Sequence, residues 1–194
     1  MGDDGGVSEP ILTVGHSTHP IEELIDLLRG AGVTDVVDVR KLPGSRRNPQ
    51  FDRDALAAAL AGAGIGYRRE ERLGGRRGAS RDVAPDVNGL WRNASFHRYA
   101  DHALGDDFRA GLAEVVALAR SPQPDDAPRR IALMCAEAVW WRCHRRIIAD
   151  HLLARGVEVL HLMPEGRLVP ATPTAGARVA DGTVEYPARP EAEG

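Results

Sequence analysis

Two cysteines are the residues of this chain whose types and spacing are best suited to chemistry. They are its only cysteines, and both fall in an eleven-residue stretch over 135–145. An apolar run over 131–134 precedes this stretch and a helical pattern over 147–155 follows it, which predicts a strand, a loop and a helix start. Unpaired amides at a helix N-terminus stabilise anions and lower thiol pKa values. The pair therefore indicates reactive thiols, although free cysteines also pack as small hydrophobes.

The two thiols differ in their expected ionisation. Cys143 is the better candidate thiolate, because it lies at the predicted helix start between Arg142 and His144. Cys135 follows a buried strand and stands beside Glu137. Burial and a nearby carboxylate both disfavour a thiolate, so we expect a supporting or resolving role for Cys135.

Length and composition predict a single compact domain in a reducing compartment. A chain of 194 residues can bury a core without disulfides. No apolar run is long enough for a membrane span, and the acidic start over 1–6 does not resemble a signal peptide. We therefore expect a cytoplasmic protein with no membrane partner. Reduced thiols there favour a catalytic, redox or metal role over a structural disulfide.

Arginine is concentrated in one segment of the chain. Residues 40–81 hold eleven basic and four acidic side chains, whereas the net charge of the whole chain is −3. Guanidinium groups bind phosphate and carboxylate in bidentate fashion, so the segment favours a small anionic ligand or a nucleotide, with nucleic acid as a further candidate partner. A biased genome would also explain it, because Lys41 is the only lysine and arginine is abundant throughout.

Strand and helix patterns alternate between two polar ends. We expect strands over 11–14, 33–39, 65–68, 130–135 and 157–162, and a short edge strand over 167–169. We expect helices over 20–30, 52–61, 91–104, 108–120 and 142–155. This order predicts a single α/β domain over 10–170, with a mostly parallel sheet and helices on both faces. Residues 1–9 are expected to be a disordered lead-in and residues 171–194 a mostly disordered tail.

Polar residues follow three of these strands, where parallel sheets bind ligands. The candidate catalytic residues at this rim are His16, Asp38, Cys135, Glu137, Cys143 and His144. The candidate substrate-binding residues are Ser17, Arg40, Ser45, Arg46, Gly74, Gly75 and Arg145. The long loop over 70–90 is expected to border the same pocket, with the backbone of 73–75 close to the ligand.

Structural roles would also account for several of these residues. Asp38 and Arg40 fit a simple ion pair at the rim, and Ser17 fits a helix cap. A carboxylate just past a buried strand is unfavourable unless it is paired. For Glu137, the candidate partners are Arg40, Arg142 and Arg145.

Several blocks together resemble the bacterial family known as domain of unknown function 488. The blocks are Thr13-Val14-Gly15-His16-Ser17, Asp38-Val39-Arg40, Pro43-Gly44-Ser45, Asn48-Pro49-Gln50-Phe51, Tyr67, Leu73-Gly74-Gly75, Cys135-Ala136-Glu137, Cys143-His144-Arg145 and Val159-Leu160-His161. The resemblance extends from about Ile11 to Val169. It implies a common fold and a shared site, but no particular reaction.

A weaker likeness connects the chain to rhodanese-type sulfurtransferases and cysteine phosphatases. These proteins also have a strand-end Asp-Val-Arg block and a cradle of strand, cysteine, loop and helix. The likeness would make Cys135 the nucleophile. In those enzymes the loop from the cysteine to the anion-binding arginine is short, whereas nine residues separate Cys135 from Arg145 here.

Three functional hypotheses follow. The first is a cysteine-dependent enzyme acting on an anionic substrate, with nucleotides and nucleic acids among the candidates. The second is a metal site that uses Cys135, Cys143 and His144, ligands suited to zinc or iron. The third is a non-catalytic module that binds nucleic acid or protein through residues 40–81.

Overall fold

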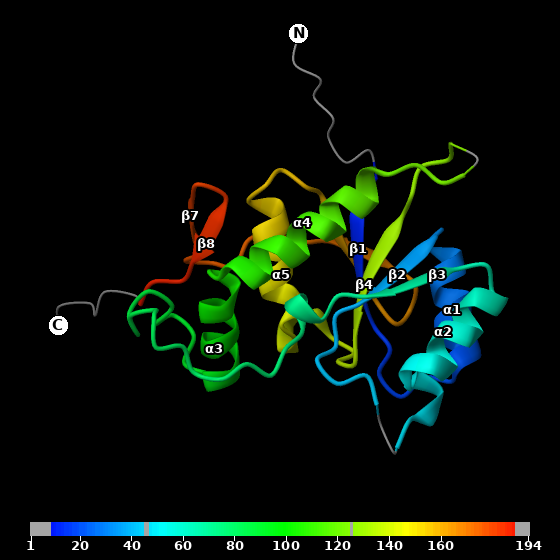
Figure 1. Ribbon diagram of the computed structural model, residues 1–194, viewed down its shortest axis with the longest axis horizontal. Helices are drawn as coiled ribbons and strands as arrows, with labels where there is room; N and C mark the ends of the chain where they lie inside the picture. Colours follow the sequence, from blue (N-terminus) through cyan, green and yellow to red (C-terminus); the bar gives the residue numbers. More distant parts are fainter. Residues whose placement is uncertain (1–8, 45–46, 125, 189–194) are drawn as a thin grey trace, which may run out of the picture.

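The computed structural model of the chain describes residues 9–44, 47–124 and 126–188. The expected lead-in at 1–8 and the last part of the expected tail, 189–194, lie outside the described residues. The elements are β1 (Ile11–Gly15), α1 (Ile21–Gly30), β2 (Asp35–Asp38), α2 (Arg53–Gly62), β3 (Gly66–Arg69), α3 (Ala94–Ala103), α4 (Asp106–Arg120), β4 (Ile131–Cys135), α5 (Arg145–Leu153), β5 (Val159–Leu162), β6 (Leu168–Pro170), β7 (Arg178–Ala180) and β8 (Thr183–Glu185) (Figure 1).

The main sheet is a parallel sheet with one antiparallel edge. Its strand order is β3-β2-β4-β1-β5-β6. Strands β1 to β5 pair in parallel, and β6 pairs with β5 in the antiparallel direction. This arrangement confirms the predicted α/β fold class. The edge strand expected near 167–169 is β6.

Helices cover both faces of this sheet. On one face α1 and α2 pack against alternate residues of β1 and β4, including Leu12 and Met134. On the other face α4 and α5 pack against the intervening residues, including Ile11 and Leu133 (Figure 1). All five residues of β1 and all five of β4 are buried, because neither strand has a solvent-facing side. The continuous apolar runs in the sequence follow from this double cover.

The central position of β4 brings three strand ends together. Cys135, the last residue of β4, pairs in register with Gly15 at the end of β1. On the other side of β4, Met134 pairs with Asp38 at the end of β2. Residues that are about a hundred positions apart in the sequence therefore meet at one edge of the sheet.

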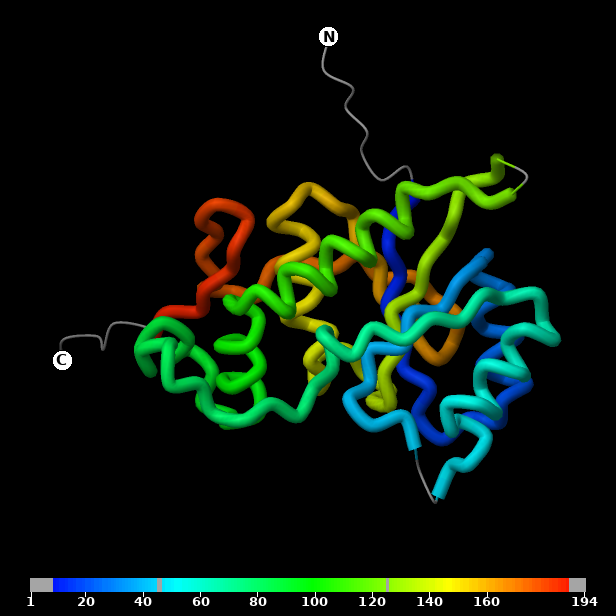
Figure 2. The backbone as a smooth tube through the Cα atoms, viewed as in Figure 1, coloured from blue at the N-terminus to red at the C-terminus, as the bar shows by residue number. Residues whose placement is uncertain are grey.

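The tail differs from the sequence prediction of a mostly disordered segment. Strands β7 and β8 form an antiparallel hairpin, and β8 packs beside α5 (Figure 2). Tyr186, which follows β8, is fully buried and donates its hydroxyl to Oδ2 of Asp150 at 2.8 Å. Oδ1 of Asp150 accepts the backbone N–H of Thr174 at 2.9 Å. A few specific anchors hold this segment, and such anchors leave no periodic pattern in a sequence.

His151 on α5 is a buried histidine whose polar ring atoms make no hydrogen bonds within the described residues. It is 1% exposed, its ring packs edge-on against Phe108, and neither ring nitrogen has a hydrogen-bond partner among the described residues. Burial, together with the positive charge of Arg155, lowers its pKa to about 3. The unfolded chain therefore binds a proton more readily than the folded protein between pH 6.5 and about 3. Protonation of His151 therefore leaves the free energy of unfolding unchanged above pH 6.5 and lowers it as the pH falls below 6.5.

We expect His151→Met to stabilise the protein and to reduce its acid sensitivity. Removing two unpaired polar atoms should raise the free energy of unfolding by about 1 kcal/mol near neutral pH. At pH 5 the difference in unfolding free energy between the variant and wild type should be larger by roughly 2 kcal/mol, because each pH unit below 6.5 contributes about 1.4 kcal/mol. Urea unfolding at pH 7.5 and pH 5 measures both effects. His19→Gln, at the surface before α1, is the control and should follow the wild-type curve; an unchanged difference at pH 5 would contradict the assignment.

Candidate functional site

A pocket of about 350 Å³ lies at the carboxyl ends of β2 and β4. Both cysteines contribute to its wall, together with residues from the loops after β2 and β3 and from α3. The sequence-predicted residues that border it are Arg40, Gly75, Cys135, Glu137, Cys143 and His144. Further lining residues are Lys41, Arg76, Tyr99 and Arg142.

The two thiols lie in direct contact. Sγ of Cys135 and Sγ of Cys143 are 2.7 Å apart, and both residues are 2% exposed. The sequence predicted that Cys143 begins a helix, but the structure places a 3₁₀ turn over Trp140–Arg142 and an extended residue at Cys143 before α5 begins. Cys143 therefore stands just before the helix. The backbone N–H of Arg145 still points at its sulfur, at 3.5 Å.

His144 is oriented as an acceptor for the proton of Cys143. Its Nε2 lies 3.1 Å from the carbonyl oxygen of Val39, which can only accept, so Nε2 carries the ring proton. Nδ1 is then the unprotonated nitrogen, and it lies 3.5 Å from Sγ of Cys143. The ring also packs against Tyr99, with centroids 4.9 Å apart. A thiol beside an imidazole acceptor is the arrangement that generates a thiolate.

The pKa values of the two thiols move in opposite directions. Burial disfavours ionisation of Cys143, but the hydrogen bond from Cys135, then His144 and Arg145, hold the pKa of Cys143 well below its usual range. Burial and the neighbouring Cys143 sulfur raise the pKa of Cys135 well above its usual range. Of the two cysteines, Cys143 is therefore the one that ionises to a thiolate, while Cys135 keeps its proton.

Arg145 is the cation behind this pair. Its side chain is 1% exposed and donates from Nη2 to the carbonyl oxygen of Glu137 at 2.6 Å. Its Nε has no hydrogen-bond partner among the described residues. Burial lowers the pKa of Arg145, but the charges of the two cysteine sulfurs outweigh burial and raise it. Arg145 and the cysteine pair therefore favour one another's charged forms.

Asp38 and Arg40 form a buried ion pair behind the pocket wall. Nε and Nη2 of Arg40 donate to the Asp38 carboxylate, the latter at 2.6 Å, and Tyr67 adds its hydroxyl at 2.8 Å. Nη1 of Arg40 donates to the carbonyl oxygen of Phe51 at 2.8 Å. Asp38 is fully buried and Arg40 is 7% exposed. The charge of Arg40 is thus balanced inside the protein, although its side chain borders the pocket.

His16 belongs to the same wall. Its Nδ1 lies 2.9 Å from the carbonyl oxygen of Ser17, and its Nε2 lies 3.2 Å from Nη1 of Arg40. Burial, followed by the charge of Arg40, lowers the pKa of His16 to about 4. The neutral ring stacks on Phe51, with centroids 4.0 Å apart. Both nitrogens are occupied, so His16 orients Arg40 and does not face the pocket.

The remaining predicted site residues are distributed as follows. Ser17 lies outside the pocket and donates its N–H to Ala136 at 3.1 Å. Gly74 lies behind the pocket lining, against Lys41. Ser45 and Arg46 lie outside the described residues. The Glu137 side chain is exposed, so water solvates it; Arg145 contacts its carbonyl oxygen, whereas the sequence predicted a need for an ion pair with its carboxylate.

Three glycines make close approaches around the site, and the closest is at Gly15. A Cβ on Gly15 would overlap the carbonyl oxygen of Glu137 and stand 2.9 Å from Nη2 of Arg145. A Cβ on Gly75 would stand 3.0 Å from Nδ1 of His144, and one on Gly74 would stand 3.0 Å from Cα of Lys41. The loop over 70–90 thus borders the pocket through Gly75 and Arg76. Its glycines approach His144 and Lys41.

Sequence reasoning missed Lys41, Arg76 and Tyr99 as pocket residues. Lys41 and Arg76 were counted only as charge in the arginine-rich segment. Tyr99 is fixed by a hydrogen bond of 2.6 Å from its hydroxyl to the carbonyl oxygen of Leu73, across 26 residues of sequence. Only the length and glycine content of the 70–90 loop indicated such a contact.

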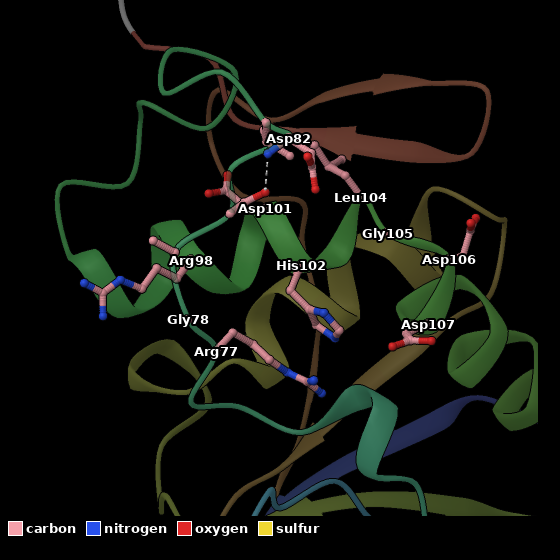
Figure 3. A pocket seen from close by; sticks show the side chains of 13 residues that line it. Arg77, Gly78, Asp82, Arg98, Asp101, His102, Leu104, Gly105, Asp106 and Asp107 are labelled. Atoms are coloured by element: carbon pink, nitrogen blue, oxygen red, sulfur yellow. Dashed lines mark hydrogen bonds between the residues drawn. The ribbon is translucent and has the colours of Figure 1, made fainter.

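A larger pocket, of about 610 Å³, lies beyond the segment 74–78 and contains neither cysteine. Arg77 and His102 point toward each other in it (Figure 3). Both are engaged with the loop backbone, because each donates to the carbonyl oxygen of Arg72, at 2.8 Å and 2.7 Å. Its other charged lining residues are Asp82, Arg98, Asp101, Asp106 and Asp107. This mixed and mainly acidic lining does not suit an anion.

The alternative metal site lacks a sufficient ligand set. Across the described residues, no group of three or more His, Cys, Asp or Glu side chains is placed to hold a metal ion. His144 also directs Nε2 at a carbonyl group, and only Nδ1 remains for a ligand bond. Structural zinc takes four such ligands. The arrangement of Cys135, Cys143 and His144 fits acid–base chemistry of thiols better.

Comparison with protein families gives one match. The model of the family described as domain of unknown function DUF488 matches residues 20–152, more than half of the chain. The chain belongs to this family. The matched range includes the Asp38-Val39-Arg40 block and both cysteines, and the match confirms the assignment to the DUF488 family. Gly15 and His16 lie before the matched range, although they pack against the same pocket wall.

The other comparisons add no relative to this DUF488 chain. Searches of curated proteins and of solved structures give no match. Within the described residues, none of the helices combines the length and apolar character needed to cross a membrane.

We expect Asp38→Asn to destabilise the DUF488 domain by about 3–5 kcal/mol, because it leaves the buried Arg40 guanidinium without a counter-charge. Asp54→Asn, which removes the exposed carboxylate paired with Arg53, is the matched control and should change stability little. Urea unfolding of both variants at pH 7.5 measures the difference. Equal effects of the two substitutions would show that the Asp38–Arg40 pair is not what holds the pocket wall.

We expect Gly15→Ala to destabilise the protein by about 3 kcal/mol, since the added methyl overlaps the 135–137 loop. Gly62→Ala on α2 is the control: a Cβ there meets no atom within 4 Å, and the change should stabilise by about 0.5 kcal/mol. Thermal unfolding compares the two. A Gly15→Ala variant with wild-type stability would refute the close packing of the β1 and β4 ends.

Proposed function

We propose that this protein is a cysteine-dependent enzyme that acts on an anionic substrate with Cys143 as its nucleophile. The observation that carries the proposal is the arrangement around Cys143. Its sulfur contacts the thiol of Cys135, faces the acceptor nitrogen of His144 and accepts the backbone N–H of Arg145, whose side chain is a buried cation. Each of these contacts favours the thiolate, which is the reactive form of cysteine.

The rhodanese likeness favours Cys135 as the nucleophile, whereas the contacts around the two sulfurs favour Cys143. The thiol of Cys135, the strand-end residue, faces the carbonyl oxygen of Glu137 at 3.8 Å, which can only accept. This contact favours the protonated form of Cys135. Cys135 therefore supports the thiolate of Cys143.

The charge of the pocket supports an anionic substrate. Lys41, Arg76 and Arg142 line it, and Arg76 and Arg142 are exposed. Among the described residues that line the pocket, Glu137 is the one acidic residue. Since the charge of Arg40 is balanced by Asp38, the other three cations are the groups left to attract an anion into the pocket.

Binding of nucleic acid as the main function is less consistent with the arginine-rich segment. Several of its arginines are committed to internal contacts: Arg69 donates to the carbonyl oxygen of Lys41, Arg72 pairs with Glu70, and Arg77 donates to three backbone carbonyls. Their charge stabilises the 70–80 loop. A concave pocket with a thiolate indicates a small anionic compound, including a nucleotide.

Alkylation tests the assignment. We expect Cys135→Ser to keep fast alkylation by iodoacetate, because serine still donates a hydrogen bond to Cys143, and Cys143→Ser to abolish it. The wild-type rate should change little between pH 6 and 8.5, whereas an ordinary thiol loses about tenfold per pH unit below its pKa of about 8.5. His144→Gln should restore that ordinary slope. Mass spectrometry of the alkylated peptide identifies the cysteine.

The controls separate thiolate reactivity from attraction of the anion. Iodoacetate should react faster than neutral iodoacetamide at low ionic strength, and added salt should reduce the difference. Cys135→Ala, which removes the donor, should slow alkylation at pH 6 more than Cys135→Ser does. Slow alkylation of Cys143 at every pH would refute the proposed nucleophile, and fast alkylation confined to Cys135 would reverse the roles.

A further inference from the structure

We propose that Cys135 and Cys143 form a redox pair that exchanges with an anionic organic disulfide, in which Cys143 attacks the substrate and Cys135 resolves the mixed disulfide. The inference rests on the proposed function, because it takes the thiolate of Cys143 as the nucleophile. It adds the class of substrate and the reason for a second cysteine in the pocket.

The position of the sulfurs is the first support. A disulfide bond is about 2.05 Å long, and the two sulfurs are already 2.7 Å apart. The pair can therefore be oxidised by a small shift of the side chains. Both sulfurs also border the same pocket, so a disulfide bound to Cys143 is formed within reach of Cys135. A second cysteine that only filled space would need neither feature.

The unequal environments of the thiols define the order of attack. Sγ of Cys143 accepts the backbone N–H of Arg145, whereas the thiol of Cys135 faces an acceptor, the carbonyl oxygen of Glu137. Because the thiolate and not the thiol attacks a disulfide, the cysteine with the larger ionised fraction, Cys143, attacks the substrate first. After attack, the positive charge of Arg145 no longer faces a thiolate on Cys143. That charge then favours deprotonation of Cys135, which lies against the same sulfur.

The two steps balance as follows. The Cys143 thiolate attacks one sulfur of the substrate R–S–S–R; a bond forms between Cys143 and RS, and the second RS⁻ leaves and takes a proton from water. Cys135 then loses its proton, and its thiolate attacks Sγ of Cys143; the bond to RS breaks, and the departing RS⁻ takes up the proton that Cys135 released. The substrate gains two electrons, and the cysteine pair loses two as it becomes a disulfide.

Arg145 makes the exchange reversible. In the reduced protein its buried charge is balanced by the thiolate, whereas a disulfide carries no charge. Oxidation therefore leaves an uncompensated buried cation, which disfavours the disulfide form. The same anionic thiol that is released can thus reduce the pair again. A thiol with carboxylate groups is also the ligand that would best compensate the cations of the oxidised pocket.

The pocket favours an anionic organic disulfide over a small peroxide. Its volume of about 350 Å³ accommodates a ligand of many atoms, and Lys41, Arg76 and Arg142 contribute positive charge to its lining. Hydrogen peroxide would use neither the volume nor the charge. A disulfide that carries carboxylates on both halves would use both.

Reaction with oxidised glutathione, an anionic disulfide, tests the inference, with bis(2-hydroxyethyl) disulfide as the neutral comparison. We expect wild-type protein to form an internal disulfide without retained glutathione. Cys135→Ser should retain one glutathione on Cys143, and Cys143→Ser should react much more slowly. Intact-mass spectrometry and assay of free thiols distinguish these products.

Charge variants test the substrate class. Lys41→Gln combined with Arg142→Gln should slow the reaction with oxidised glutathione about tenfold more than it slows the reaction with the neutral disulfide. Arg120→Gln, which removes an exposed arginine at the end of α4 away from the pocket, is the matched control and should have no effect. Equal rates with both disulfides in wild-type protein would overturn the anionic substrate.

The failures of the two proposals are distinguishable. If wild-type protein retains glutathione as stably as Cys135→Ser does, the resolving role is wrong, while fast alkylation of Cys143 would leave the proposed nucleophile intact. If Cys143→Ser reacts as fast as wild type, both the redox pair and the proposed nucleophile are refuted.

Discussion

The buried guanidinium of Arg145 is the constraint on which the rest of the site depends. A charge that is 1% exposed needs a compensating charge nearby, and the structure brings the Cys143 sulfur to that position. Arg145 also holds the carbonyl oxygen of Glu137 at 2.6 Å, so the same side chain shapes the loop that connects the two cysteines. The burial of Arg145 therefore affects both the conformation of the loop between the cysteines and the ionisation of their thiols.

A second buried ion pair supports this arrangement from the neighbouring strand. Asp38 neutralises Arg40, and Arg40 in turn fixes His16 and the carbonyl oxygen of Phe51. Arg40 follows the end of β2 and His16 follows the end of β1, the two strands that flank β4, where a parallel sheet leaves backbone and side chains free to face the loops. The pocket wall is thus rigid where charges are paired. Its unpaired cations, from Lys41, Arg76 and Arg142, lie on the loops around it.

Local sequence pattern was sufficient for the fold class and for much of the rim. Buried strands with helices on both faces leave continuous apolar runs, and these identified β1, β2 and β4 within a few residues. Once the strands are parallel, their ends must share one edge, so the meeting of Cys135, Asp38 and His16 near that edge followed from the strand predictions. The hairpin of β7 and β8 was missed, because it is held by Tyr186 and Asp150 rather than by a periodic apolar face.

Thus the sequence by itself determined the α/β fold, the family and the presence of two thiols at one strand end. Only the tertiary structure decided which groups share charge: Arg40 pairs with Asp38, Glu137 contributes its carbonyl oxygen, and Arg145 faces the sulfurs. It also placed Tyr99, Lys41 and Arg76 around the pocket. The reason is physical, since strand and helix periodicity are properties of neighbouring residues, whereas the ionisation of a buried group depends on the distance and direction of charges far away in the chain.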